Sequence, residues 1–167
     1  MTHHEQNKNA AKLLTEKIKG IRVAMMTTAE PDGTLYSRPM ATLDMESDGD
    51  LWFFTQASTP KAQDVQRHQQ VNLSYTKPDD NLFISVSGTA QLVRDQKKMK
   101  DLWKPYLKAW FPKGLEDPDL ALLQVTAHHA EFWDAPSGAM GRIYSAVKGL
   151  ATGGKDMGGE NEKLDIK

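Results

Sequence analysis

Residues 82–92 alternate strictly between two sets of side chains, and this pattern constrains the fold more than any other feature of the chain. Because successive side chains of a strand point to opposite faces, the alternation predicts a long β-strand with one apolar face. The apolar set is Leu82, Ile84, Val86, Gly88, Ala90 and Leu92, and the other set is Phe83, Ser85, Ser87, Thr89 and Gln91.

Shorter extended segments surround this strand and are separated by turn signals such as Glu30-Pro31-Asp32-Gly33. Only one helix, at residues 59–68, is predicted among the first five strands, which favours an antiparallel barrel over a parallel α/β sheet. Further helices are predicted at residues 5–19 and 95–107. We therefore expect a mainly β (α+β) fold, with the other strands at residues 23–28, 34–44, 51–55, 71–76, 120–126 and 130–134.

The length of 167 residues suits a single domain with a real core. We assign residues 1–148 to this domain. Residues 149–167 are rich in glycine and charged side chains, so we expect them to form a disordered tail.

Charge and composition exclude several classes of partner. Lys and Arg number 21 against 22 Asp and Glu, giving a net charge of -1, so no overall field attracts nucleic acid or an anionic membrane. No apolar run approaches the roughly 18 residues of a membrane span. The absence of cysteine removes disulfides and thiolate chemistry and suits a reducing compartment, so we expect a cytoplasmic protein.

The segment after the strand at residues 51–55 predicts an anion site. Ser58 or Thr59 can cap a helix that starts at Pro60. Proline suits the first position of a helix, because the N–H group that it lacks makes no hydrogen bond within the helix there. The unpaired N–H groups of such a helix start attract an anion, and Lys61 adds a full charge within the first turn. An ordinary capped helix remains the alternative.

A second candidate lies in the extended segment around Arg38. Alternation places Tyr36, Arg38, Met40 and Thr42 on one face. An arginine among such neighbours must either pair with an anion or stay exposed to solvent. Pro39 indicates an edge strand or a bulge, because proline cannot donate to a β-ladder. A solvent-facing arginine on a hairpin is the alternative.

Aromatic residues with helical spacing occur in the segment 103–111. Core packing, a subunit interface and a flap over a planar ligand all remain open for this stripe, because aromatic residues concentrate at each. Trp133 ends the last predicted strand and either borders a ring-shaped ligand or closes the barrel. The stripe consists of Trp103, Tyr106, Leu107, Trp110 and Phe111.

Catalytic and metal motifs are not evident. His128 and His129 are neighbours on a predicted strand and point to opposite faces, so they cannot readily chelate one metal. No serine stands in a nucleophile-elbow context and no pair of carboxylates stands out. We therefore assign neither catalytic side chains nor a metal site.

Taken together, these segments resemble the flavin-binding split-barrel family of pyridoxine 5'-phosphate oxidase, and most closely its general stress protein branch. The resemblance covers roughly residues 10–135. It is carried by the order and spacing of Ser37-Arg38-Pro39-Met40, Trp52-Phe53-Phe54-Thr55, Ser58-Thr59-Pro60-Lys61-Ala62, residues 83–88 and Glu131-Phe132-Trp133.

The resemblance implies a six-stranded antiparallel split barrel with peripheral helices, assembled as a homodimer that binds FMN, or FAD, between its subunits. It implies that Arg38 and Lys61 neutralise the flavin phosphate and that Trp133 of the other subunit lines the ring. The remaining residues that it implies at the cofactor are Pro39, Met40, Phe54, Thr55, Ser58 and Thr59.

Three departures from the oxidase argue against oxidation of pyridoxine phosphate. The oxidase has Ser-Arg-Lys at the helix start, where this chain has Thr59-Pro60-Lys61, and it has a lysine where this chain has Leu43. Its substrate-binding Arg and His are replaced by Ala139 and Gly141.

Two hypotheses on function follow, an NAD(P)H-dependent flavin oxidoreductase with an unknown acceptor, and a flavin carrier or sensor without turnover. A lesser alternative is a haem-binding split barrel, which would need an axial ligand among His68, His128 and His129.

Overall fold

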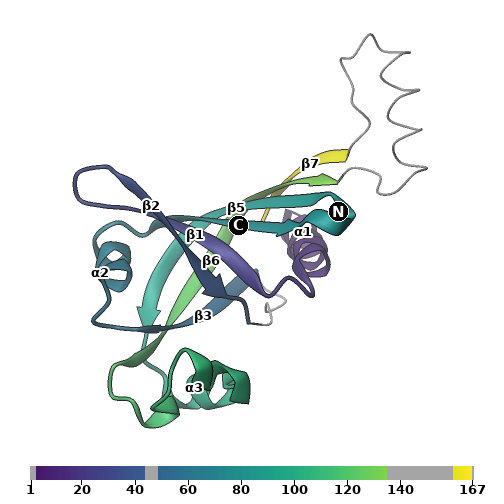
Figure 1. Ribbon diagram of the computed structural model, residues 1–167. Helices are drawn as coiled ribbons and strands as arrows, with labels where there is room; N and C mark the ends of the chain where they lie inside the picture. Colours follow the sequence, from purple (N-terminus) through teal and green to yellow (C-terminus); the bar gives the residue numbers. More distant parts are fainter. Residues whose placement is uncertain (1–2, 44–48, 135–159, 167) are drawn as a thin grey trace, which may run out of the picture.

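The computed structural model describes residues 3–43, 49–134 and 160–166 and shows a curled antiparallel sheet with helices around it (Figure 1). No helix in this described part of the chain is both long and apolar enough to cross a membrane. In chain order the helices and strands are α1 (His3–Ile18), β1 (Val23–Ala29), β2 (Leu35–Ala41), β3 (Asp50–Gln56), α2 (Pro60–Arg67), β4 (Gln70–Lys77), β5 (Leu82–Val93), α3 (Gln96–Leu102), β6 (Leu120–Asp134) and β7 (Glu160–Asp165), with short 3-10 turns η1 (Pro78–Asp80), η2 (Pro105–Ala109) and η3 (Gly114–Glu116).

The strand order is β2-β1-β4-β5-β6-β3, and β7 also pairs with β6. Every pairing is antiparallel. The edge strands β2 and β3 contact each other, so the sheet curls into a split barrel. This confirms the predicted mainly β, antiparallel split-barrel fold.

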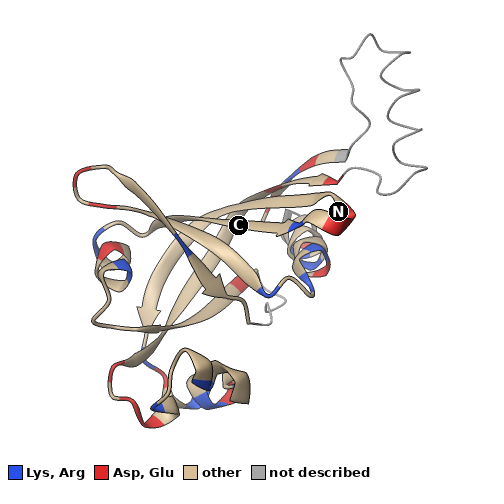
Figure 2. Cartoon of the chain, viewed as in Figure 1, with Lys and Arg blue, Asp and Glu red and all other residues tan. Residues whose placement is uncertain are grey.

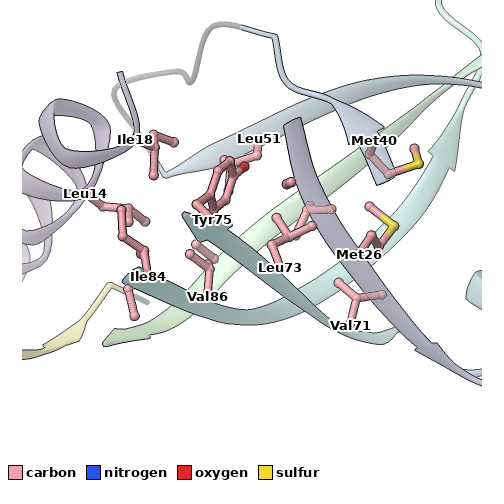
Figure 3. Close-up of a cluster of buried hydrophobic side chains, with 14 of the residues drawn as sticks. Leu14, Ile18, Met26, Met40, Leu51, Val71, Leu73, Tyr75, Ile84 and Val86 are labelled. Atoms are coloured by element: carbon pink, nitrogen blue, oxygen red, sulfur yellow. The ribbon is translucent and has the colours of Figure 1, made fainter. Parts of the chain in front are cut away.

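The main core fills the interior of the curled sheet (Figure 3). On β5 the apolar set of the alternation is buried from Leu82 to Ala90, as its pattern predicted. Leu14 and Ile18 of α1 enter the core from one side, and Val65 of α2 is buried in the same cluster. The two helices therefore complete a core that the sheet alone would leave open.

A second, smaller core lies between the sheet and the segment after β5. Trp52 and Phe54 of β3 pack there against Met99 and Leu107. The predicted helix at residues 95–107 ends at Leu102, because Pro105 cannot continue it and instead opens the 3-10 turn η2.

The aromatic stripe does not form a single face as helical spacing predicted. Leu107 is buried, and Trp103 and Phe111 pack on the second core. In contrast, Tyr106 is 55% exposed and Trp110 is 62% exposed. The change of helix type after Trp103 rotates these two rings away from the core.

The two strands predicted at residues 120–126 and 130–134 are one continuous strand, β6. It passes through a register shift opposite Ser87 and Gly88, where Ser87 pairs with His129 and Gly88 with Ala127. A Cβ on Gly88 would lie only 2.2 Å from the Thr126 carbonyl oxygen. Glycine therefore allows the two backbones to approach and the bulge to form.

The prediction of a disordered tail over 149–167 is wrong for its last part. Residues 160–165 form β7, and both Leu164 and Ile166 are buried in the main core. One apolar residue in this short strand and one directly after it were too weak a signal among the glycines and charges around them. The preceding residues, 149–159, lie outside the described part, as do residues 135–148 of the predicted domain.

Candidate functional site

Arg38 lies on the inner face of the edge strand β2. It pairs across the hairpin with Met26, which is completely buried. Its Nη1 donates a hydrogen bond of 2.7 Å to the Thr28 hydroxyl, and its guanidinium carbon lies 4.8 Å from the centre of the Tyr36 ring. Thr28 and Tyr36 therefore fix the position of the guanidinium group.

The start of α2 has the geometry that the sequence predicted, with one difference. Thr59 occupies the N-cap position and Pro60 the first helical position. However, the Thr59 hydroxyl donates to the carbonyl of Gln56 at 2.7 Å and does not cap an N–H of the helix. Consequently, it leaves donors of the first turn without a side-chain partner.

Thr55 ends the buried part of β3 beside this helix start. Thr55 is 0% exposed. Its hydroxyl oxygen makes only long contacts, 3.4 Å to the carbonyl oxygen of Gln56 and 3.5 Å to the hydroxyl oxygen of Thr59. Thr55 and Thr59 therefore place two hydroxyl groups side by side at the start of α2.

Ser58 is engaged in a different way from that expected. Its N–H donates to Oδ1 of Asp119 at 3.1 Å and its hydroxyl to Oδ2 at 2.5 Å. A carboxylate that accepts both bonds holds the Ser58 proton firmly. To donate to a phosphate, as the resemblance implies, Ser58 would have to release Asp119.

The electrostatics of Lys61 and Arg38 point to an anion. Burial, and then the charge of Arg38, lower the pKa of the half-buried Lys61. Burial also lowers the pKa of Arg38, while the nearby carboxylate of Asp64 opposes this effect. Among the described residues neither cation has a carboxylate within ion-pair distance, so an anion between them would relieve their repulsion.

Charged side chains are sparse over most of the sheet and more frequent on the helices and turns (Figure 2). Arg38 is thus one of few cations on the strands, and Lys61 is the second residue of α2. The candidate anion site depends on these two side chains and not on a broad basic surface.

Three other predicted cofactor residues contribute little through their side chains. Met40 is 4% exposed and belongs to the main core. Phe54 is also 4% exposed, with its ring centre 5.3 Å from that of Trp103 and 6.1 Å from that of Phe111. Pro39 lies on the outer face of β2, opposite Met25. On the inner face of β2 and β3, these three residues can therefore contact a ligand only through their backbone atoms.

Within one chain, Trp133 is not brought together with Arg38. It lies on β6, opposite Phe83, and is 40% exposed on the outer face of the sheet. Arg38 lies on the inner face of β2, four strand spacings away, which is about 19 Å along the curved sheet. In the described chain the two side chains therefore lie on opposite faces of the sheet and do not converge on one site.

Sequence reasoning missed Thr28, Asp64 and Asp119. Asp64 is 6% exposed and follows Lys61 by three residues, a spacing that places both on one side of a helix and could have been noticed. Thr28 could have been found from the hairpin, which pairs it with Tyr36. Asp119 is distant in sequence from Ser58, and no local pattern connects them.

Two of the three histidines considered as metal or haem ligands, His128 and His129, are hydrogen-bonded. Nε2 of His128 lies 3.0 Å from the Thr89 hydroxyl, and Nδ1 of His129 lies 2.8 Å from a carboxylate oxygen of Asp165. In the described part of the chain, no three His, Asp or Glu side chains gather in a way that could hold a metal.

Three concavities open near the start of β1, away from the two cations. Their volumes are about 370, 440 and 520 Å³, and Arg22 lines all three. None of the three is lined by Arg38 or Lys61.

Comparison with known proteins gives consistent results. Residues 9–156 match the family model described as pyridoxamine 5'-phosphate oxidase like. Protein bli-3 of Neurospora crassa is 32% identical over 142 residues, which cover 79% of this chain and 68% of that protein.

Solved structures agree with the fold. The general stress FMN/FAD binding protein of Xanthomonas citri has a TM-score of 0.66 and 30% identity, with 78% of this chain and 92% of that chain covered. A protein of Clostridium acetobutylicum related to general stress protein 26 has a TM-score of 0.69 at 16% identity, covering 95% and 96% of the two chains. Since the family model spans most of the sequence, this chain belongs to the pyridoxamine 5'-phosphate oxidase-like family.

Proposed function

We propose that the protein binds a flavin nucleotide, FMN or FAD, with a phosphate at Arg38 and Lys61. The observation that carries this proposal is the approach of two partly buried cations with no ion-pair partner in the described part of the chain. It is supported by the Xanthomonas citri relative, which is named an FMN/FAD binding protein.

Each residue at the site then has a role that suits its position. Arg38, held by Thr28, and Lys61 supply charge. Thr55 supplies a hydroxyl donor at the start of α2. Thr59 joins it on release from the Gln56 carbonyl, and Ser58 on release from Asp119. Backbone atoms of Pro39, Met40 and Phe54 line the path of the ligand, because the side chains of Met40 and Phe54 are buried.

We further propose a homodimer in which Trp133 of one subunit completes the flavin site of the other. The outer face of the sheet presents Val23, Met25 and Phe83, which are 49%, 41% and 46% exposed, in addition to Trp133. An exposed apolar face of this kind is typical of an interaction surface. No nucleic-acid or membrane partner enters this proposal.

When bound, the flavin supplies two-electron redox chemistry, and the protein binds and orients it. We favour an oxidoreductase reduced by NADH or NADPH that passes electrons to an acceptor of unknown identity; a carrier or sensor without turnover is the alternative. Oxidation of pyridoxine phosphate is disfavoured, since Leu43 replaces the lysine of the oxidase. The departure at Ala139 and Gly141, which replace the substrate-binding Arg and His, lies outside the described residues.

Titration of flavin-free protein with FMN and with riboflavin tests the phosphate assignment. We expect FMN to bind more tightly, because only FMN carries the phosphate. Equal affinity for both ligands would contradict the assignment.

Anaerobic mixing of the FMN-loaded protein with NADH or NADPH separates the two functional alternatives. Loss of the flavin absorbance bands is expected for an oxidoreductase. Unchanged bands with both donors would leave the carrier or sensor.

A further inference from the structure

The turn before β6 reaches the start of α2 with a carboxylate. Asp119 lies directly before the first residue of β6. Its side chain accepts two hydrogen bonds from Ser58, one of 3.1 Å from the N–H to Oδ1 and one of 2.5 Å from the hydroxyl to Oδ2. A single carboxylate therefore joins the turn to the helix start, although the two residues are 61 positions apart in the sequence.

The Asp119 carboxylate accepts from the same kinds of donor that a phosphate would use at this helix start. Phosphate oxygens accept from backbone N–H groups and from hydroxyl groups, and Ser58 gives one donor of each kind to Asp119. The positive end of the helix dipole also favours a negative charge here. The carboxylate can therefore substitute for a bound anion at the start of α2.

Release of Ser58 from the Asp119 side chain would leave the turn attached to the helix start. The Ala57 N–H donates to the backbone carbonyl of Asp119 at 2.8 Å. Nε2 of Gln56 donates to Oδ2 of Asp117 at 3.3 Å, and the Asp119 N–H donates to Oδ1 of Asp117 at 3.0 Å. None of these three bonds uses the Asp119 carboxylate, so its side chain can turn away without separating the two segments.

The charge of Asp119 acts in the same direction as its hydrogen bonds. Among the described residues, Asp119 has no cation within ion-pair distance. It is bonded to Ser58, which precedes Lys61 by three residues, so its charge lies near any phosphate held at Lys61. Two negative groups at such a short separation repel each other.

We infer that Asp119 is an internal competitor for the flavin phosphate. It holds Ser58 until a phosphate displaces it, and its charge opposes the phosphate, so FMN binds less tightly than Arg38 and Lys61 alone would allow. The inference rests on the proposed flavin binding. A site with such a competitor can exchange its flavin nucleotide, whereas a flavin without phosphate is not affected.

Titration of the flavin-free full chain with FMN and with riboflavin, followed by quenching of flavin fluorescence, tests the inference. Asp119→Asn removes the charge and keeps the shape of the side chain. It should tighten FMN about three- to tenfold, because the competing charge-assisted bonds are weakened, and leave riboflavin unchanged. Damage to the fold would weaken binding, so it cannot be mistaken for this gain in affinity.

Ser58→Ala shows whether the effect passes through Ser58. Alanine removes the hydroxyl that Asp119 binds and keeps the backbone N–H. In the Ser58→Ala background, Asp119→Asn should therefore tighten FMN less than it does in the wild type. An equal gain in both backgrounds would mean that Asp119 acts only through its charge, and would overturn the competition for Ser58.

Glu116→Gln is the matched control. Glu116 is an exposed carboxylate of η3, shortly before Asp119 in the chain, and it makes no hydrogen bond to Ser58 in the described part of the chain. Its replacement should leave the affinity for FMN nearly unchanged. If Glu116→Gln tightens FMN as much as Asp119→Asn does, the general negative charge of the turn accounts for the gain and the inference is wrong.

The same titrations separate this inference from the phosphate site on which it rests. If the wild type prefers FMN to riboflavin but Asp119→Asn does not tighten FMN, the competitor is wrong and the phosphate site stands. Equal affinity of the wild type for the two flavins contradicts the phosphate site and the competitor together. Circular dichroism checks the fold of each variant, and Asp119→Ala decides the question if Asp119→Asn does not fold.

Discussion

At the scale of single residues, Lys61 offers the most direct test of the phosphate site. Replacing Lys61 with Ala should weaken FMN by about 1 to 3 kcal/mol, because a charge-assisted bond to the phosphate is lost. Riboflavin, which lacks phosphate, should bind as before. Quenching of flavin fluorescence measures both affinities.

The exposed Lys8 on α1 provides a matched control for this change. Lys8→Ala should leave the affinities for FMN and riboflavin unaltered. If Lys61→Ala weakens the two flavins equally, Lys61 acts on the fold of the site and not on the phosphate.

The buried hydroxyl of Tyr75 should make the free energy of unfolding depend on pH. Tyr75 is 0% exposed, and burial raises the pKa of its hydroxyl well above the ordinary range. Thr42 lies near enough to oppose this shift slightly, yet neither hydroxyl has a hydrogen-bond partner of good geometry in the described part of the chain. Among the described residues, the Tyr75 hydroxyl is therefore buried and unpaired.

Because the folded state keeps the Tyr75 proton, stability is unaffected below the pKa of an unfolded tyrosine, about 10. Above that pH it should fall by up to about 1.4 kcal/mol per pH unit. Tyr75→Phe should lack this part of the decline and should change the free energy of unfolding at pH 7 by less than about 1 kcal/mol. Urea titrations at pH 7 and pH 11 measure both effects, and Tyr106→Phe, at an exposed tyrosine, should retain the wild-type slope.

Residue identity and spacing predict that Arg38, Thr59 and Lys61 lie beside an anion, and this stays a prediction. They were insufficient for Ser58, whose partner Asp119 comes from a turn far away in the sequence. They were also insufficient for Phe54, which is buried only because Trp103 and Phe111 return to cover it. Local patterns indicate which residues can bind, and tertiary contacts decide which remain free to do so.

At the scale of secondary-structure elements, the β5–β6 bulge depends on Gly88. Gly88→Ala should destabilise the protein by about 2 kcal/mol or more, because the new methyl group meets the Thr126 backbone. Chemical denaturation measures the loss. Gly20→Ala is the comparison, since its φ is +84 but nothing lies within 4 Å of the added group, and it should cost only about 1 kcal/mol. Equal losses would argue against a steric role for Gly88.

Strands were predicted well where alternation was long, as in β5, and poorly where it was interrupted. The bulge at His128 breaks the alternation of β6, which is why one strand was predicted as two. β7 was missed because its burial depends on β6 and α1, not on its own composition. The helix after β5 was predicted too long because its charged stretch was extended through Pro105, where the structure changes to the 3-10 turn η2.

At the scale of the whole molecule, the apolar outer face of the sheet predicts a dimer. Met25→Glu should shift the protein toward monomer, because it introduces a charge into the proposed interface. The subunit itself should stay folded, since the Met25 side chain is already 41% exposed. Light scattering after size-exclusion chromatography measures the mass, and circular dichroism checks the fold.

Trp110→Glu introduces the same charge at an exposed aromatic residue off the sheet and should leave the dimer intact. A wild-type protein that is monomeric at micromolar concentration would contradict the dimer. It would also leave Trp133 without a role at the ligand.

The packing of α1 against β7 joins segments from opposite ends of the described chain. During synthesis, α1 leaves the ribosome long before β7 exists. Its apolar side, which includes Leu14, therefore stays exposed to solvent while the barrel strands are made. The nascent chain is therefore expected to stay sensitive to proteases and to need chaperones until β7 has been translated.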